Sequence, residues 1–433
     1  MIIEPSKRKA EKFQQENVHL FIRKALFWAS RFSHCSYYCP NDLPYLHDPF
    51  LHFLAADAVS TLDIDDGNNF NSLQTYHDSK KDWLVGNLGY DLKNEVERLS
   101  STNQDLIKFD SINFFQPRHL IFFSSENIEI HSFDDPKHLF EEIDSVKLPS
   151  LAEGINKTSI EAKVHKEKYL QVVNRIREQI IKGEVYELNY CMEFYGNNKL
   201  FDPLAAFLKL NNLSPMPFAA FQKIEDKYLV CASPERFLKK NGGKLISQPI
   251  KGTIGRGKTS EEDEALKFEL QNSEKERAEN MMIVDLVRND LAKSSITGSI
   301  KVQELFGIYS YTKVHQMVST VISEAKAEIS FSEIIKNAFP MGSMTGAPKV
   351  IAMKIIEEIE DTKRGIFSGA AGYITPQGNF DFNVVIRSLL YNQTSGNLSF
   401  QVGSAITYDS VPEKEYEECL LKADALLALM RKK

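Results

Sequence analysis

The chain has 433 residues, of which 42% are hydrophobic and 26% are charged, a balance typical of a soluble globular protein with one large core or two ordinary ones. A formal net charge of −7 gives no electrostatic basis for nucleic-acid binding, and no apolar run is long enough to cross a bilayer. The 5 cysteines are odd in number and scattered, which argues against a disulfide framework. We therefore expect a cytoplasmic protein that binds neither nucleic acid nor membrane.

The first part of the chain has strand patterns but no chemical motif. Residues 82–91 run into a glycine turn, and residues 113–123 form a second apolar stretch. Residues 144–163 are polar and show little periodicity, which is typical of a boundary between domains. We therefore divide the chain into an N-terminal layer, residues 1–150, and a second region, residues 160–433.

The second region alternates between helix and strand patterns. Apolar residues recur at helical spacing in four segments, so helices are expected at 166–182, 274–292, 348–359 and 413–430. Strands are expected at 185–194, 218–222, 228–232, 244–250, 312–321, 369–375, 380–390 and 398–402. Many antiparallel-looking strands with long helices between them favour an α+β fold.

Residues 248–253 form the most informative stretch, because they are expected to carry Lys251 from the end of a strand into a turn before an acidic helix. Gly252 provides the permissive backbone that a sharp exit needs. Most lysines are solvated surface charges, and that remains the alternative here. The flanking Pro-Ile and Gly-Thr pairs, however, fix this side chain where a surface charge would need no fixing. We interpret Lys251 as a reactive amine.

Residues 252–259 also satisfy the phosphate-loop pattern G-x-x-x-x-G-K-[ST], so a nucleoside triphosphatase is a remote alternative. The next helix begins with four acidic residues, 261–264, which would repel a triphosphate at the helix N-terminus. The apolar segment 281–285, which would have to be the magnesium-binding strand, lies inside a continuous helical pattern. Both observations count against nucleotide binding.

Two helices each place carboxylates in line with an apolar, inward-facing stripe. Glu276 and Glu279 share a face of the helix at 274–292. Glu418 and Lys422 share a face of the last helix, where the simpler interpretation is a solvated i,i+4 pair. Two such carboxylates make a Mg²⁺ site plausible, because that ion binds few protein oxygens and keeps waters or substrate oxygens for the rest.

Two further features are suited to binding a carboxylate ligand. Residues 341–349 form a small-residue loop that opens a helix, and its free amide groups could bind an anion or simply cap the helix. Arg387, expected on the strand at 380–390, could hold a carboxylate bidentately or be an ordinary strand charge. The spacing alone leaves both alternatives open.

Five motifs in order resemble the chorismate-utilising enzymes: residues 233–237, 249–253, 279–291, 342–349 and 364–373. The resemblance covers the chain from about Val164 to its C-terminus. It implies an α+β fold with a large antiparallel β-sandwich core and helices packed outside. It also implies an N-terminal layer of the anthranilate synthase component I type, chorismate as substrate and Mg²⁺ as cofactor.

The resemblance implies a role for each matching residue. Lys251 would add to the chorismate ring at C2 while the C4 hydroxyl leaves, with Glu235 as general acid. His315 stands where the family has an active-site histidine, and Glu279 and Glu418 would hold the metal. The substrate-binding residues implied are Gly252, Thr253, Thr345, Arg387, Gly403, Ser404 and Lys422. Glu235 would need a raised pKa, whereas the pKa of Lys251 would need to fall, as burial and a nearby cation would favour.

Lysine at position 251 is typical of the members that aminate chorismate at C4, and the expected product is 4-amino-4-deoxychorismate for 4-aminobenzoate and folate synthesis. Anthranilate synthases typically have alanine at this position, and anthranilate synthesis remains the alternative within the family. At the position of Glu187, relatives that add water to chorismate have a lysine, and those that add an amine usually have a glutamine. Glu187 matches neither group. Phe367 replaces a tyrosine found in many relatives. A catalytically silent homologue is a third alternative. The presence of all four central residues counts against it: Glu235, Lys251, Glu279 and Glu418.

The ammonia would come from a partner protein. The sequence has no Gly-x-Cys-x-Gly nucleophile of a glutaminase. If glutamine is the nitrogen source, a separate glutamine amidotransferase subunit must release the ammonia. The resemblance therefore predicts a heterodimer.

Overall fold

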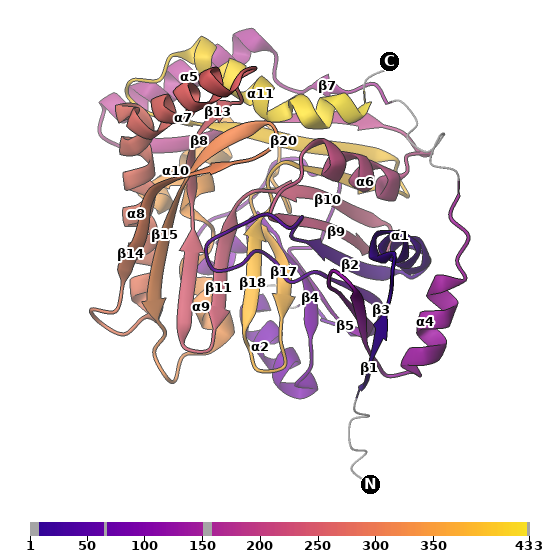
Figure 1. The fold of residues 1–433 in the computed structure, drawn as a ribbon. Coiled ribbons are helices and arrows are strands. Elements are labelled where there is room, and N and C mark those ends of the chain that lie inside the picture. Colours follow the sequence, from indigo (N-terminus) through magenta and orange to yellow (C-terminus); the bar gives the residue numbers. More distant parts are fainter. Residues whose placement is uncertain (1–7, 65–66, 150–157, 431–433) are drawn as a thin grey trace.

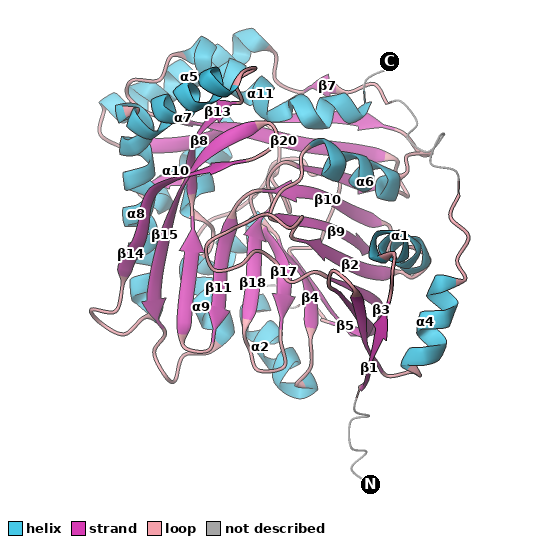
Figure 2. Ribbon diagram, in the orientation of Figure 1, coloured by secondary structure: helices cyan, strands magenta, loops and turns pink. Residues whose placement is uncertain are grey.

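The computed structural model describes residues 8–64, 67–149 and 158–430, and every pairing between its strands is antiparallel. Figure 1 shows two groups of strands that run in different directions, with helices on the outside. Figure 2 shows the same strands as a continuous inner layer. The predicted α+β fold with an antiparallel sandwich core and outer helices is therefore confirmed. Of the predicted boundary segment, residues 150–157 lie outside the described residues.

The first sheet carries one wall of the core. In spatial order its strands are β8 (Glu187–Asn197), β20 (Asn397–Ile406), β19 (Ser388–Asn392), β10 (Lys227–Ser233), β9 (Phe218–Ile224), β2 (His34–Cys39) and β3 (Phe53–Thr61). Two short strands, β7 (Glu161–Ala162) and β16 (Gly346–Ala347), pair with the free edge of β8.

The second sheet carries the opposite wall. In spatial order its strands are β14 (Lys301–Ser310), β15 (Val314–Glu324), β12 (Lys244–Gln248), β11 (Arg236–Asn241), β18 (Phe380–Val384), β17 (Ala370–Ile374) and β4 (Leu84–Leu88). Strand β13 (Ile250–Gly255) also pairs with β15. It pairs with residues 314–318 of β15, whereas β12 pairs with residues 321–324, so the two strands lie end to end beside β15.

One long strand, β5 (Ile112–Phe123), joins the two sheets. It pairs with β4 near its start and with β3 over residues 115–122. The hairpin partner β6 (Asn127–Ser132) and strand β1 (Lys9–Gln14) extend it on the outside. The pairings β2–β9 and β4–β17 cross the predicted division between residues 1–150 and 160–433. The N-terminal layer thus supplies strands to both sheets, and its status as a separate domain stays a prediction.

The helices cover the outer faces of both sheets. They are α1 (Val18–Ala29), α2 (Asn69–Lys80), α3 (Lys93–Val96), α4 (Pro136–Asp144), α5 (Lys166–Ile181), α6 (Pro203–Leu213), α7 (Ser260–Asn272), α8 (Glu274–Ser294), α9 (Phe331–Ala338), α10 (Lys349–Ile359) and α11 (Pro412–Met430). Apolar side chains of α5, α6, α10 and α11 pack with the first sheet, and those of α8 and α9 pack with the second. A third cluster, rich in aromatic rings such as Tyr38, Phe53 and Tyr373, fills the space between the sheets. These buried apolar faces produce the helical periodicity of the sequence.

The segment around Lys251 differs from the prediction. Pro249 ends β12, and the chain resumes as β13 at Ile250, so Lys251 lies within a strand rather than in a turn. The pairing register shifts between Ile250 and Thr253, and Gly252 has a φ of 96°. Such a bulge redirects one side chain without ending the strand.

The predicted strand at 380–390 is also two strands. β18 ends at Val384 and β19 begins at Ser388, and between them Arg387 has a left-handed φ of 52°. Non-glycine residues rarely adopt that conformation, so the apolar pattern alone cannot predict the break. None of the described helices is long and apolar enough to span a membrane.

Candidate active site

A cavity lies where β13 and β20 approach α8 and α11, with an empty volume of about 840 Å³ that is partly open to solvent. Nine of the twelve predicted site residues line it: Glu235, Lys251, Gly252, Thr253, Glu279, Arg387, Gly403, Glu418 and Lys422. They come from segments more than 180 residues apart in the sequence, so the fold brings them together.

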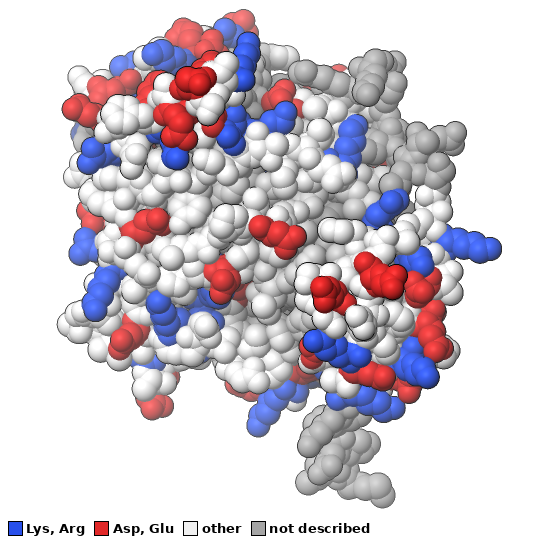
Figure 3. Space-filling model, in the orientation of Figure 1, with Lys and Arg blue, Asp and Glu red and all other residues white. Residues whose placement is uncertain are grey.

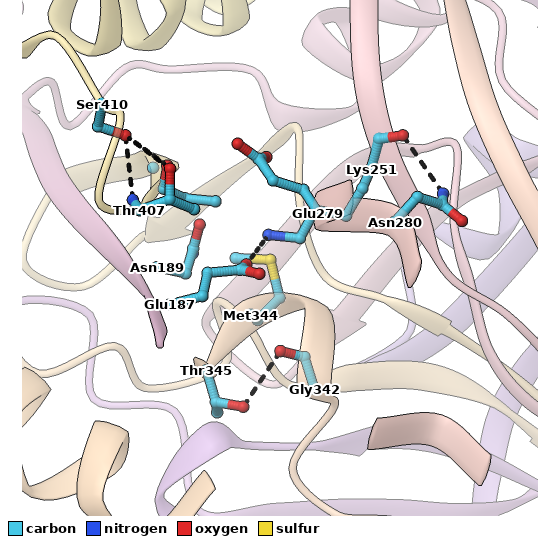
Figure 4. A network of polar contacts seen from close by, with 12 residues as sticks. Glu187, Asn189, Lys251, Glu279, Asn280, Gly342, Met344, Thr345, Thr407 and Ser410 are labelled. Carbon is cyan, nitrogen blue, oxygen red and sulfur yellow. Dashed lines mark hydrogen bonds and ion pairs between the residues drawn. The ribbon is translucent and has the colours of Figure 1, made fainter. Parts of the chain in front are cut away.

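Lys251 occupies the centre of this group. Its side chain is 8% exposed, and its Nζ donates a hydrogen bond to Oε1 of Glu187 at 2.5 Å. Figure 4 shows this pair, with Glu279 on the other side of the lysine. The backbone carbonyl of Lys251 accepts a long hydrogen bond, 3.4 Å, from the side-chain amide of Asn280. The side-chain oxygen of Asn280 accepts a second hydrogen bond, from the hydroxyl of Ser319 at 2.6 Å. The residue after Glu279 in α8 therefore contacts the backbone that carries the lysine.

The charge state of Lys251 differs from the prediction. Burial lowers its pKa, but the negative charges of Glu187, Glu279 and Glu235 outweigh that effect and hold the pKa above its ordinary value. We predicted a shift toward the neutral amine, because burial and a nearby cation both favour it. The contact with Glu187, which was not predicted, makes the largest contribution of a negative charge to this shift.

Glu235 is buried where β10 gives way to β11. Its backbone amide donates to the hydroxyl of Ser233 at 3.2 Å, and that hydroxyl donates to the carbonyl of Val384 at 2.6 Å. Burial raises the pKa of Glu235 to about 7, although the nearby hydroxyl of Ser343 and the charge of Lys251 oppose the shift. At neutral pH a substantial fraction of this carboxyl group is protonated, which is the state that a general acid requires.

Three carboxylates face the other side of the cavity, Glu276 and Glu279 from α8 and Glu418 from α11. Burial raises the pKa of Glu279 to about 8 and that of Glu276 above its ordinary value. Oε1 of Glu279 is buried without a hydrogen bond, and the nearest cation is Nζ of Lys275 at 3.7 Å. These groups are short of positive charge, which a bound cation would supply.

The donor set suits Mg²⁺ better than a softer metal. The described residues contain no group of three or more histidine, cysteine or acidic side chains arranged to hold a metal. Oxygen ligands from only two carboxylates, Glu279 and Glu418, leave positions for water and substrate, as Mg²⁺ prefers. Glu418 now pairs with Lys422 at 2.5 Å, and although burial alone would raise its pKa, the charge of Lys422 holds it below the ordinary value. The residues present therefore fit the ion.

Positive charge lies on the remaining side of the cavity. Burial lowers the pKa of Arg387 to about 10, with Glu418 opposing the shift, so the guanidinium stays charged at neutral pH. Nζ of Lys422 donates to the carbonyl of Gly403 at 2.8 Å. A fixed guanidinium and a fixed ammonium are suitable partners for the carboxylates of a small anionic substrate.

Two of the predicted site residues have side chains on the face of their strand that points away from the cavity. His315 precedes the cavity-lining Gln316 on β15, so its ring points the other way and contacts Ser310 at 2.8 Å and Asp263 at 3.0 Å. Ser404 likewise lies between Gly403 and Ala405 on β20, and its hydroxyl bonds to that of Tyr169 at 2.8 Å. The structure does not bring His315 or Ser404 into the cavity.

Thr345 is the third predicted residue outside the cavity lining. Its hydroxyl donates to the carbonyls of Met341 and Gly342, both at 3.2 Å, and therefore closes the loop on itself (Figure 4). The neighbouring Ser343 and Met344 line the cavity instead. The loop therefore reaches the cavity, but the structure does not bring the side chain of Thr345 into its lining.

Several cavity residues were not predicted. Asn189 shares a face of β8 with Glu187, two positions away, and Gln401 lies two positions before Gly403 on β20. The period of two along a strand is the signal that could have identified both. Phe367, noted as a departure, also lines the cavity and offers no hydroxyl to a ligand.

The phosphate-loop pattern does not form an anion site. Thr259 caps α7, the backbone amide of Gly257 donates to Asp263 at 2.8 Å, and that of Lys258 donates to Glu262 at 2.7 Å. The amides that would hold a phosphate are thus already bound to carboxylates of the same helix. Residues 281–285 lie inside α8, so the strand that the motif requires is missing. The nucleotide-binding alternative was wrong.

Comparison with known proteins gives a consistent result. Residues 35–428 match the family model described as chorismate binding enzyme. The probable chloroplastic aminodeoxychorismate synthase of Oryza sativa subsp. japonica is 36% identical over 378 residues, which are 86% of this chain and 39% of that relative. Aminodeoxychorismate synthase component 1 of Escherichia coli (strain K12) is 32% identical over 350 residues, 80% of this chain and 77% of the relative. The chain thus spans less than half the length of the rice relative.

Among solved structures, anthranilate synthase component I from Streptococcus pneumoniae TIGR4 has the same fold. Its TM-score is 0.77 at 24% sequence identity, and the match covers 90% of this chain and 94% of that one. The fold is therefore shared between proteins whose names give different products. The fold alone does not select the reaction.

Proposed function

This chain belongs to the family of chorismate binding enzymes, and from that premise we propose that it aminates chorismate at C4 to give 4-amino-4-deoxychorismate. The observation that carries the proposal is the position of Lys251, whose amine lies in the cavity opposite a carboxyl group, Glu235, with a pKa of about 7. The names of the rice and E. coli relatives support the same reaction.

The side chains of the cavity have separate proposed roles in the reaction. Arg387 and Lys422 would hold the substrate carboxylates and fix the ring relative to Lys251. The neutral amine of Lys251 adds at C2, both ring double bonds shift toward C4, and the C4 hydroxyl leaves as water with the proton of Glu235. Ammonia then adds at C4, both double bonds shift back, and the bond from C2 to Lys251 breaks. Glu235 recovers its proton from the new ammonium group, so the enzyme is restored.

Glu279 and Glu418 would hold Mg²⁺. When bound, the ion would supply positive charge for a substrate carboxylate. Its charge would also favour the ionised form of Glu279, whose pKa burial now raises to about 8.

The nitrogen would come from a glutamine amidotransferase subunit in a heterodimer. The designation "component 1" of the E. coli relative supports a multi-component enzyme. The proposed compartment is the cytoplasm, and the five free cysteines, all buried, agree with a reducing environment.

The test is the identity of the product. Purified protein is incubated with chorismate, Mg²⁺ and an ammonium salt, and the product is identified by chromatography and mass spectrometry, in parallel with Lys251→Ala. We expect 4-amino-4-deoxychorismate from the wild type and its loss, or a drift toward anthranilate, in the variant. Anthranilate from the wild type would instead assign the chain to the alternative reaction, and no turnover of chorismate would refute both.

A further inference from the structure

Glu187 forms a buried pair with the proposed nucleophile, and the reaction as written gives it no role. Its side chain is 1% exposed, Oε1 accepts the hydrogen bond of Lys251 at 2.5 Å, and Oε2 is buried without a hydrogen-bond partner. Its second oxygen can therefore accept a further hydrogen bond.

The backbone around Glu187 holds the carboxylate firmly in place. Glu187 begins β8 opposite Ala347 of β16, and the amide of Tyr186 donates to the carbonyl of Ala347 at 2.7 Å. Two residues later the amide of Asn189 donates to the carbonyl of Thr345 at 2.8 Å. The loop that precedes α10 therefore fixes the start of β8, the strand that carries Glu187 toward Lys251 (Figure 4).

The surroundings of Lys251 pose a chemical problem. Three carboxylates, Glu187, Glu279 and Glu235, act on the lysine and favour its charged form. An ammonium group has no lone pair and cannot add to C2. A proton must leave Nζ before each turnover, and among the described residues Glu187 is the acidic side chain in hydrogen-bond contact with that atom.

We propose that Glu187 is the base that takes the proton from Lys251 before the amine adds to chorismate, and that it returns this proton when the product is released. The inference rests on the proposed amination of chorismate. The transfer runs along the existing hydrogen bond and needs no movement of either side chain. It leaves Glu187 neutral and Lys251 as a free amine, while the total charge of the pair is unchanged.

The proton count closes over the full cycle. The proton of Lys251 moves to Glu187, and Glu235 protonates the leaving hydroxyl as the bond from Nζ to C2 forms. After ammonia has added at C4, Glu235 takes one proton from the new ammonium group. The bond from C2 to Nζ then breaks to release a neutral amine, and Glu187 returns its proton to Nζ. The net reaction is chorismate plus ammonia to 4-amino-4-deoxychorismate plus water.

This assignment predicts a particular dependence on pH. In the wild type the proton stays within the pair, so the supply of free amine does not change with pH near neutrality. In Glu187→Gln the amide oxygen can still accept the hydrogen bond, but the proton must leave to solvent. The ratio of the variant rate to the wild-type rate should then rise about tenfold per pH unit between about pH 6 and 8. Taking the ratio cancels the titration of Glu235, which is common to both proteins.

The experiment measures the first half-reaction alone. Each protein is mixed with chorismate and Mg²⁺ without ammonia, quenched rapidly, and the covalent adduct on Lys251 is quantified by intact mass and peptide mapping. Omitting ammonia removes the pH dependence of the ammonia supply. The matched control is Glu193→Gln, a buried carboxyl group on the same strand that bonds to Ser399 at 2.6 Å and lies outside the cavity lining. Its rate ratio should not change with pH.

A rate ratio for Glu187→Gln that stays constant with pH would overturn the proposal, because Glu187 would then take no proton from Lys251. Should the glutamine variant not fold, Glu187→Asp carries the test. This variant retains a carboxylate but withdraws it by one methylene, so we expect the wild-type pH profile at a rate lowered at least tenfold, and an unchanged rate would contradict the inference. Product analysis of the wild type with ammonia separates this failure from failure of the proposed function itself.

Discussion

One buried lysine and one half-buried lysine form ion pairs of the same length in this protein, and they lie in very different settings. Nζ of Lys251 is 2.5 Å from Glu187, and Nζ of Lys349 is 2.5 Å from Asp290. Burial, with Asp290 opposing it, lowers the pKa of Lys349, whereas the surrounding carboxylates raise that of Lys251 despite its burial. The length of the ion pair therefore does not distinguish the proposed nucleophile from the other lysine.

The surroundings do make that distinction. Lys349 also donates to the carbonyl of Ala338 at 3.3 Å, and Asp290 accepts from Lys293 as well, so both partners are satisfied by the protein itself. Around Lys251 there is an excess of carboxylates and an open cavity. An excess of one charge next to empty space indicates a site that awaits a ligand.

The largest expected effect comes from Lys251→Met. Removing the amine removes the covalent route, so product formation should fall about 10³-fold or more. Adding Glu187→Gln to this variant removes the unpaired carboxylate and should restore stability without restoring activity. Steady-state product analysis and denaturant unfolding would check the two parts. Recovery of activity in the double variant would show that Lys251 is not the nucleophile.

Glu235→Gln should lower adduct formation about 10²-fold, since general-acid catalysis is lost. The pKa of Glu235 is about 7, and the acid acts only when protonated, so the wild-type rate should fall about tenfold per pH unit above pH 7. The variant should lack that decline, which a pH profile of adduct formation would reveal. A wild-type rate that rises through this range would exclude Glu235 as the acid.

Lys349→Met should act on stability instead of chemistry. It leaves the buried Asp290 with only Lys293 as a partner, and we expect a loss of about 2 kcal/mol in the free energy of unfolding. Denaturant titration would measure it, and adding Asp290→Leu should recover most of the loss. Product formed per folded molecule should change less than threefold. A large fall in this quantity would mean that the pair also serves the cavity.

Lys258→Ala should have the smallest effect. Its side chain is exposed and lies in the phosphate-loop pattern, whose amides bind Asp263 and Glu262. Activity should stay within twofold of wild type, and Mg²⁺-ATP should not raise the melting temperature of either protein. Stabilisation of the wild type by Mg²⁺-ATP that the variant loses would revive the nucleotide-binding interpretation.

The sequence predicted those features that depend on local periodicity. The helix expected at 274–292 is α8 (Glu274–Ser294), and the one expected at 413–430 is α11 (Pro412–Met430). The break before β19 was missed, because nothing in a run of apolar residues marks the left-handed conformation of Arg387. Strand β14 was also missed; none of its residues is buried, so its sequence lacks the pattern of a core strand.

The candidate site was predicted as a set of positions, and the residues that do not line the cavity differ from the others in the direction of their side chains. A motif places His315 in the correct strand but does not say which face its side chain occupies, and the pleat turns it toward Asp263. The contact between Glu187 and Lys251 joins residues 64 positions apart. No local pattern encodes that contact, so the effect of Glu187 on the pKa of Lys251 could not be predicted.

Helix α8 has a consequence for how the site can move. Glu279 faces the cavity, and the next residue, Asn280, bonds to the backbone of Lys251 and to the hydroxyl of Ser319 on β15. The proposed metal ligand and the proposed nucleophile are thus attached to one rigid segment. A displacement of α8 would carry both groups together, so the spacing between them would be preserved while their distance to Arg387 and Glu235 changed. Any coupling to a partner subunit that acts through this helix would therefore adjust the fit of the substrate without separating the lysine from the metal.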